Sequence, residues 1–132
     1  MKALLSVTAV LEATTGLALV ARPAEPVAVL LGSTLESPTA MTIGRIAGAA
    51  LLSLGVACWL ARNDARSRAA SGLIAAMLLY NAAVVVFLAR AGIVSRLFGI
   101  GLWPAVLVHL AMAIWCVICL RIKSAEHQNW NV

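Results

Sequence analysis

Charged residues are scarce in this chain of 132 residues, at 11% against 63% hydrophobic residues. A water-soluble surface needs far more charge, so a soluble globular protein is excluded. Three cysteines are too few for a disulfide framework and read as free thiols. The sequence also lacks an HExxH motif, a phosphate-binding loop and a nucleophile with an adjacent base, so it gives no support to an enzyme.

What the chain does contain is four long apolar runs, each about the twenty residues that cross a roughly 30 Å hydrocarbon core as a helix. Proline marks their limits: Pro23 follows the first run, Pro38 opens the second and Pro104 opens the fourth. The sequence therefore predicts an all-α integral membrane protein, a single four-helix transmembrane bundle over residues 1–132. The predicted spans are approximately 3–21, 38–61, 69–90 and 103–121.

The basic residues predict the orientation of this bundle. With four spans, the termini and the middle loop share one side, which carries Lys2, Arg62, Arg66, Arg68, Arg121 and Lys123. The opposite side carries Arg22, Arg90 and Arg96. Six against three places both termini in the cytoplasm. The net charge of +5 then suits anionic lipid headgroups, so the lipid bilayer is the expected partner and nucleic acid is not.

Targeting features are also missing. Glu12 interrupts the first run and no A-x-A cleavage site follows it, so we interpret this run as a span and not as a signal peptide. There is no Asn-x-Ser/Thr acceptor and no Arg- and Ser-rich transit segment. A multi-pass protein of the bacterial inner membrane is the simplest prediction.

The connections carry their own signals. An apolar patch, residues 27–31, is too short to span and is expected to lie on the membrane interface or to fold back against the bundle. Residues 92–101 form a second interfacial stretch. The polar turn at 62–68 predicts that spans two and three form an antiparallel hairpin. In span two, Gly44 and Gly48 favour close packing inside the bundle over a dedicated dimer motif.

Each predicted span contains one strongly polar residue near mid-membrane or toward the non-cytoplasmic side. The four are Glu12, Arg45, Asn81 and His109. Such residues are costly in lipid and so predict either a ligand, ion or proton site or a set of structural bonds between helices. In the structural alternative, Glu12 pairs with Arg45 while Asn81 and His109 hydrogen-bond between helices.

The neighbours of these residues refine the prediction. Thr8, Thr15 and Gly16 share a helical face with Glu12, which predicts a small, polar stripe directed inward. Tyr80 lies about 100° around the helix from Asn81 and is interpreted as a packing residue.

A second pattern runs along span four, where His109, Met112, Cys116 and Cys119 follow one another at helical spacing. These are soft ligands for Cu(I), or, through His109, for haem. Against a metal, cysteine and methionine are common apolar residues in membrane helices, and the spans contain no second histidine for bis-histidine ligation. We therefore predict no cofactor and keep these residues as minor metal candidates.

Two short segments resemble known families of four-helix membrane proteins. Residues 11–16, LEATTG, resemble the first helix of the small multidrug resistance transporters, which implies a proton and cation site at Glu12. The Gly-rich third helix and the characteristic tryptophan of that family are absent here. Cys116-Val117-Ile118-Cys119 is similar to the fourth-helix CxxC of the vitamin K epoxide reductase family, but the loop cysteines of that family are missing. We assign the chain to neither.

Three functions stay open. The leading hypothesis is a compact transporter or small-ligand or ion-binding protein that uses the intramembrane polar residues, working as a homo-oligomer because four helices leave little room for a pathway. The alternative is a non-catalytic accessory, anchor or assembly subunit of a larger membrane complex. A haem- or copper-binding redox protein comes third.

Overall fold

A computed structural model describes residues 1–65 and 67–129, with side chains as far as Lys123. Arg66, one of the basic residues behind the predicted orientation, lies outside the described residues. The elements in chain order are α1 (Lys2–Ala21), α2 (Ala24–Leu31), α3 (Pro38–Ala61), the 3₁₀ turn η1 (Arg62–Asp64), α4 (Arg68–Ile93) and α5 (Leu102–Asn129).

Four of these helices are long and apolar enough to cross a membrane, and each contains one predicted span. Their outer surfaces are apolar: Leu60 and Leu79 are each 73% exposed. Such surfaces are stable only against lipid. The protein is therefore an all-helical, multi-pass membrane protein.

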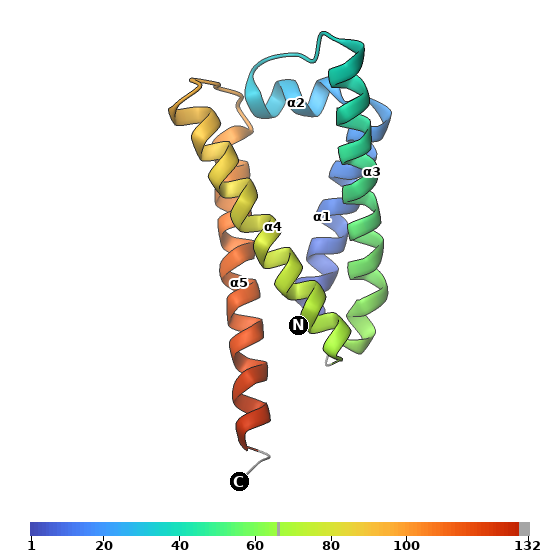
Figure 1. The fold of residues 1–132 in the computed structure, drawn as a ribbon, viewed down its shortest axis with the longest axis vertical. Coiled ribbons are helices and arrows are strands. Elements are labelled where there is room, and N and C mark those ends of the chain that lie inside the picture. The colour runs from blue at the N-terminus through green and yellow to red at the C-terminus, as the bar shows by residue number, and fades with distance from the viewer. Residues whose placement is uncertain (66, 130–132) are drawn as a thin grey trace.

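The helices pack as two pairs, α1 with α3 and α4 with α5. The pairs meet where α1 begins and where α3 turns into α4, and they diverge toward the other end, which α2 crosses (Figure 1). The prediction that spans two and three pack together as an antiparallel hairpin is therefore wrong. α3 and α4 run apart from their shared turn, because α3 packs along α1 instead.

Glycine explains why α3 prefers α1. A Cβ added to Gly16 would lie 2.5 Å from the backbone nitrogen of Leu52 and 2.7 Å from the Gly48 oxygen. A Cβ on Gly55 would lie 2.9 Å from the nitrogen of Ala13. Helices in lipid associate through such small residues, because no hydrophobic force drives them together. Packing of Gly48 inside the bundle is thus confirmed.

The short helix α2 connects the two pairs at their diverging ends. The Gly101 N–H donates a hydrogen bond to the Val29 carbonyl at 2.9 Å, and Gly99 lies so close to the Val29 oxygen that a Cβ at this position would not fit. The apolar patch at 27–31 therefore folds back against the bundle, the second of the two predicted alternatives.

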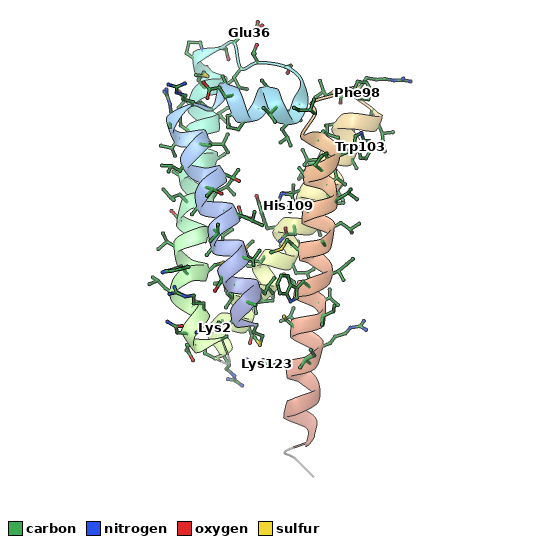
Figure 2. All side chains as sticks on the ribbon, turned by 180° about the vertical axis from the view of Figure 1, so that it is seen from behind. Lys2, Glu36, Phe98, Trp103, His109 and Lys123 are labelled. Atoms are coloured by element: carbon green, nitrogen blue, oxygen red, sulfur yellow. The ribbon has the colours of Figure 1, made fainter. Side chains whose placement is uncertain are left out.

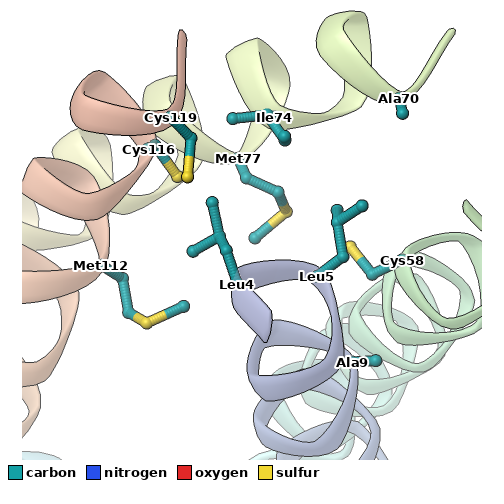
Figure 3. Packing of buried hydrophobic residues seen from close by; sticks show 10 residues of the cluster. All are labelled: Leu4, Leu5, Ala9, Cys58, Ala70, Ile74, Met77, Met112, Cys116 and Cys119. Carbon is teal, nitrogen blue, oxygen red and sulfur yellow. The ribbon is translucent and has the colours of Figure 1, made fainter. Parts of the chain in front are cut away.

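At the opposite end, an apolar cluster joins the two pairs (Figure 3). Leu4 and Leu5 of α1 are at most 1% exposed and pack among residues of α3, α4 and α5. The remaining buried members of the cluster are Ala9, Cys58, Ala70, Ile74, Met77, Met112, Cys116 and Cys119. All three cysteines are buried free thiols, as predicted. The cluster closes the space between the pairs at this end.

Candidate functional site

A cavity of about 240 Å³ lies between α1, α4 and α5, next to the apolar cluster. Its walls combine polar and apolar side chains from the middle of α1 and α4 and from the first half of α5. The lining residues are Leu11, Glu12, Thr15, Tyr80, Asn81, Pro104, Ala105, Val108, His109 and Met112. Three of the four polar residues singled out in the sequence therefore meet at one cavity.

Glu12 supplies the acidic group of the cavity from the middle of α1. It is 5% exposed, and Tyr80 of α4 lines the same cavity. None of the lysines and arginines described in the structure lines the cavity. A carboxylate here must be balanced by a proton or by a bound cation, because an isolated charge within a membrane is costly.

Asn81 and His109 form a bond between α4 and α5. The Asn81 Nδ2 donates to the carbonyl of Met77, one turn earlier, at 2.7 Å. The amide oxygen of Asn81 then lies 2.7 Å from His109 Nδ1. Because an amide oxygen can only accept, Nδ1 must carry the proton of this bond. This part of the structural alternative, a hydrogen bond between helices, is present.

Tyr80 connects the two halves of the site. It lines the cavity together with Glu12, and its ring meets the His109 ring edge-on, with centroids 5.8 Å apart and planes at 79°. The interpretation of Tyr80 as a packing residue is confirmed, because the side chain packs against the apolar cluster, but the sequence did not predict that it also lines the cavity. Two positions 100° apart on one helix can both face a cavity that two neighbouring helices border, so α4 presents both Tyr80 and Asn81.

The other residues of the polar stripe on α1 lie in different surroundings: some are packed in the protein interior and one lines the cavity. Gly16 packs against α3, whereas Thr15 lines the cavity. Thr8 is 1% exposed, and its hydroxyl is buried without a hydrogen-bond partner. The inward direction of the stripe is thus confirmed for Thr8 and Gly16.

Arg45 does not join the cavity. It is exposed on α3, and the described residues show no ion pair between it and Glu12. The register of the pair explains this: Gly16 faces Leu52, seven residues beyond Arg45 along α3 and so about 10 Å away along its axis. Glu12 lies further still. The expected ion pair was therefore wrong, although α1 and α3 are neighbours.

The minor metal candidates occupy two environments. His109 belongs to the cavity, Cys116 and Cys119 belong to the apolar cluster (Figure 3), and Met112 belongs to both. Leu4 extends between Met112 and the other sulfur-bearing side chains in the same view. Among the described residues, no three His, Cys, Asp or Glu side chains are grouped so that they could hold a metal ion.

Comparison of the chain with protein-family models, curated proteins and solved structures finds no match. The function must therefore be argued from the geometry of the cavity. His109 lies about two turns after the start of α5, on the side that faces the other helix pair (Figure 2). A carboxylate, a phenol and an imidazole meet there within an apolar surrounding, an arrangement that can bind a polar head group or hold and release a proton.

Proposed function

We propose that the protein is a compact transporter that binds a small ligand in the Glu12 cavity, within the bacterial inner membrane. Its termini lie in the cytoplasm, following the six-to-three distribution of basic residues. The transporting unit is a homo-oligomer, because one copy of a four-span bundle has little room for both a binding site and a pathway.

The observation that carries this proposal is a cavity at mid-span that contains an acidic side chain without a basic partner. Ionisable residues within a membrane mark ligand, ion or proton sites by default. Glu12 contributes little to holding the helices together, because the described residues show no ion pair between its carboxylate and a buried cation. The helices are instead held by glycine contacts and by the Asn81–His109 bond.

The size of the cavity limits the ligand. At about 240 Å³ it lies below the range of about 300–1,000 Å³ typical of drug-sized ligand sites. The ligand is therefore smaller than a drug, with one polar end for Glu12 and His109 and an apolar body for the remaining walls.

Native mass spectrometry of the protein released from lipid nanodiscs tests the proposal. We expect one type of subunit in more than one copy, carrying a bound molecule lighter than a lipid. Glu12→Gln should lose that molecule and keep the oligomer. Ser53→Ala is the matched control, because Ser53 is exposed and its hydroxyl bonds only to the Ala49 carbonyl of its own helix, at 2.8 Å. A wild-type spectrum without any small molecule would contradict the proposal.

A second candidate, an accessory subunit, is favoured by a separate groove on the outside of the α1–α3 pair. This apolar groove of about 370 Å³ is lined by Ala9, Val10, Ala13, Thr14, Gly55, Val56 and Trp59. Small side chains there allow a helix of another protein to approach closely. If this candidate is right, the spectrum contains a foreign subunit, and Val10→Trp, which fills the groove without touching the cavity, removes it.

A further inference from the structure

The hydrogen bond between Asn81 and His109 decides which atom His109 offers to a ligand. Asn81 Nδ2 is engaged by the Met77 carbonyl, so Asn81 Oδ1 accepts from His109 Nδ1. The Nε2 atom lies on the opposite edge of the ring. It has no hydrogen-bond partner among the described residues, and it belongs to a side chain that lines the cavity. In a neutral imidazole this nitrogen is an acceptor.

Glu12 offers acceptors as well. Its side chain lines the cavity, and an ionised carboxylate has about four acceptor positions, so it can accept several hydrogen bonds at once. The Glu12 carboxylate and His109 Nε2 can thus both accept hydrogen bonds from a ligand, while the Thr15 hydroxyl can donate or accept. A ligand that complements this pair must carry more than one donor on a single polar end.

The charge of the cavity points to a cation. Glu12 is the only charged side chain among the lining residues, and no described lysine or arginine reaches it. A ligand with an anionic end would place like charges together in a medium of low dielectric constant. A neutral hydroxyl would offer a single donor and leave the carboxylate uncompensated.

The remaining walls determine the other end of the ligand. Leu11 of α1 and Val108 and Met112 of α5 are apolar, as are Pro104 and Ala105. These walls come from helices that belong to different pairs and make few direct contacts with each other. An apolar body is therefore held between the pairs, with its polar end at Glu12 and His109.

We propose that the cavity binds a small hydrophobic primary or secondary amine as its ammonium ion. The ammonium N–H groups donate to the Glu12 carboxylate and to His109 Nε2, and the hydrocarbon part lies against Leu11 and Val108. The inference rests on the proposed binding function and names the ligand class. It requires N–H donors, so a quaternary ammonium ion, which has the charge without the donors, does not satisfy the site.

Three matched compounds test this inference: 2-phenylethylamine, its N,N,N-trimethyl derivative and 2-phenylethanol. Saturable binding is measured by calorimetry on the full-length protein in nanodiscs, with empty nanodiscs subtracted to remove partition into lipid. We expect the amine to bind at least tenfold more tightly than either of the other two. Glu12→Gln and His109→Phe should each weaken amine binding at least tenfold.

Two variants separate binding from folding. Glu12→Asp keeps a carboxylate and should retain part of the affinity that Glu12→Gln loses. Ser53→Ala should bind as the wild type does. Each variant is accepted only if its circular dichroism and oligomeric size match the wild type, so that a loss of binding reports the site.

The outcomes distinguish this inference from the proposed function. Equal or tighter binding of the trimethyl compound or of the alcohol, still dependent on Glu12, would overturn the amine assignment and leave a ligand site in place. No saturable binding of 2-phenylethylamine would also overturn the assignment. The proposed function is then decided separately by the molecule retained in the native mass spectrum.

Discussion

The interface between α1 and α3 and the space between α1, α4 and α5 are built in opposite ways from the same helix. On one face of α1, Gly16 brings the backbone of α3 so close that no Cβ fits. On the adjoining face, Glu12 and Thr15 border a cavity of about 240 Å³. One side of α1 is thus tightly packed and the other is left open and polar. In a bundle this small, such a difference separates the part that holds the fold from the part available for function.

The largest loss of stability is expected from adding a side chain at the tightly packed contact between α1 and α3. Gly16→Ala places a methyl group 2.5 Å from the backbone nitrogen of Leu52, so the helices must separate. Overpacking of this kind costs about 1–3 kcal/mol, and the rigid backbone neighbours favour the upper part of that range. The measurement is the melting temperature in detergent, together with the yield of folded protein.

Gly72→Ala is the matched control for that change. It introduces the same methyl group on α4, where nothing lies within 4 Å of the new Cβ. Its melting temperature should equal or slightly exceed that of the wild type, since alanine favours a helix over glycine by up to about 1 kcal/mol. Equal destabilisation by both variants would show that the α1–α3 contact is not special.

An intermediate loss of stability is expected between α4 and α5, where a hydrogen bond joins the two helices. Asn81→Leu removes the hydrogen bond that joins His109 to α4 and leaves its Nδ1 without an acceptor among the described residues. Interhelical bonds of this type contribute about 0.5–2 kcal/mol in membranes. Thermal unfolding should shift downward by less than in Gly16→Ala, and amine binding should fall because the His109 ring loses its orientation. Unchanged binding in Asn81→Leu would show that Asn81 does not position His109.

Glu12→Gln tests whether the open, polar side of α1 contributes to activity and not to stability. Because Glu12 is not paired with a described cation, its neutral analogue should change the free energy of unfolding by less than about 1 kcal/mol. Proton-linked transport in proteoliposomes, followed with an internal pH-sensitive dye, should be abolished. Retained activity would remove Glu12 from the mechanism, and a large loss of stability would place it with the structural residues.

The sequence could predict the spans because their length and apolar composition are set by the bilayer itself. It could also predict that Glu12, Asn81 and His109 avoid lipid, since each is costly there. It could not predict that α3 pairs with α1 and departs from α4, because a short turn fixes which ends are close and leaves the long contacts undetermined. Those contacts follow from the fit of Gly16, Gly48 and Gly55.

The positions of Tyr80 and Arg45 relative to the cavity were not predicted from the sequence, for two different reasons. Tyr80 was judged by its angle from Asn81, but a cavity between two helices accepts side chains over a wider arc than a single contact does. A hydroxyl-bearing aromatic residue beside a buried amide was the signal available for it. Arg45 was judged by its approximate depth, and depth between neighbouring helices depends on a register that only the glycine contacts define.

The smallest effect is expected from Arg45→Gln, and it tests that register directly. Arg45 is exposed on α3, about 10 Å along the helix axis from the level of Leu52, which faces Gly16. Its replacement should leave the melting temperature, the oligomeric size and ligand binding unchanged. If Arg45→Gln instead lost binding as Glu12→Gln is expected to do, α3 would have to slide or rotate on α1 during function. The packed face of α1 would then be a moving part, and the division between a fixed face and a functional face would fail.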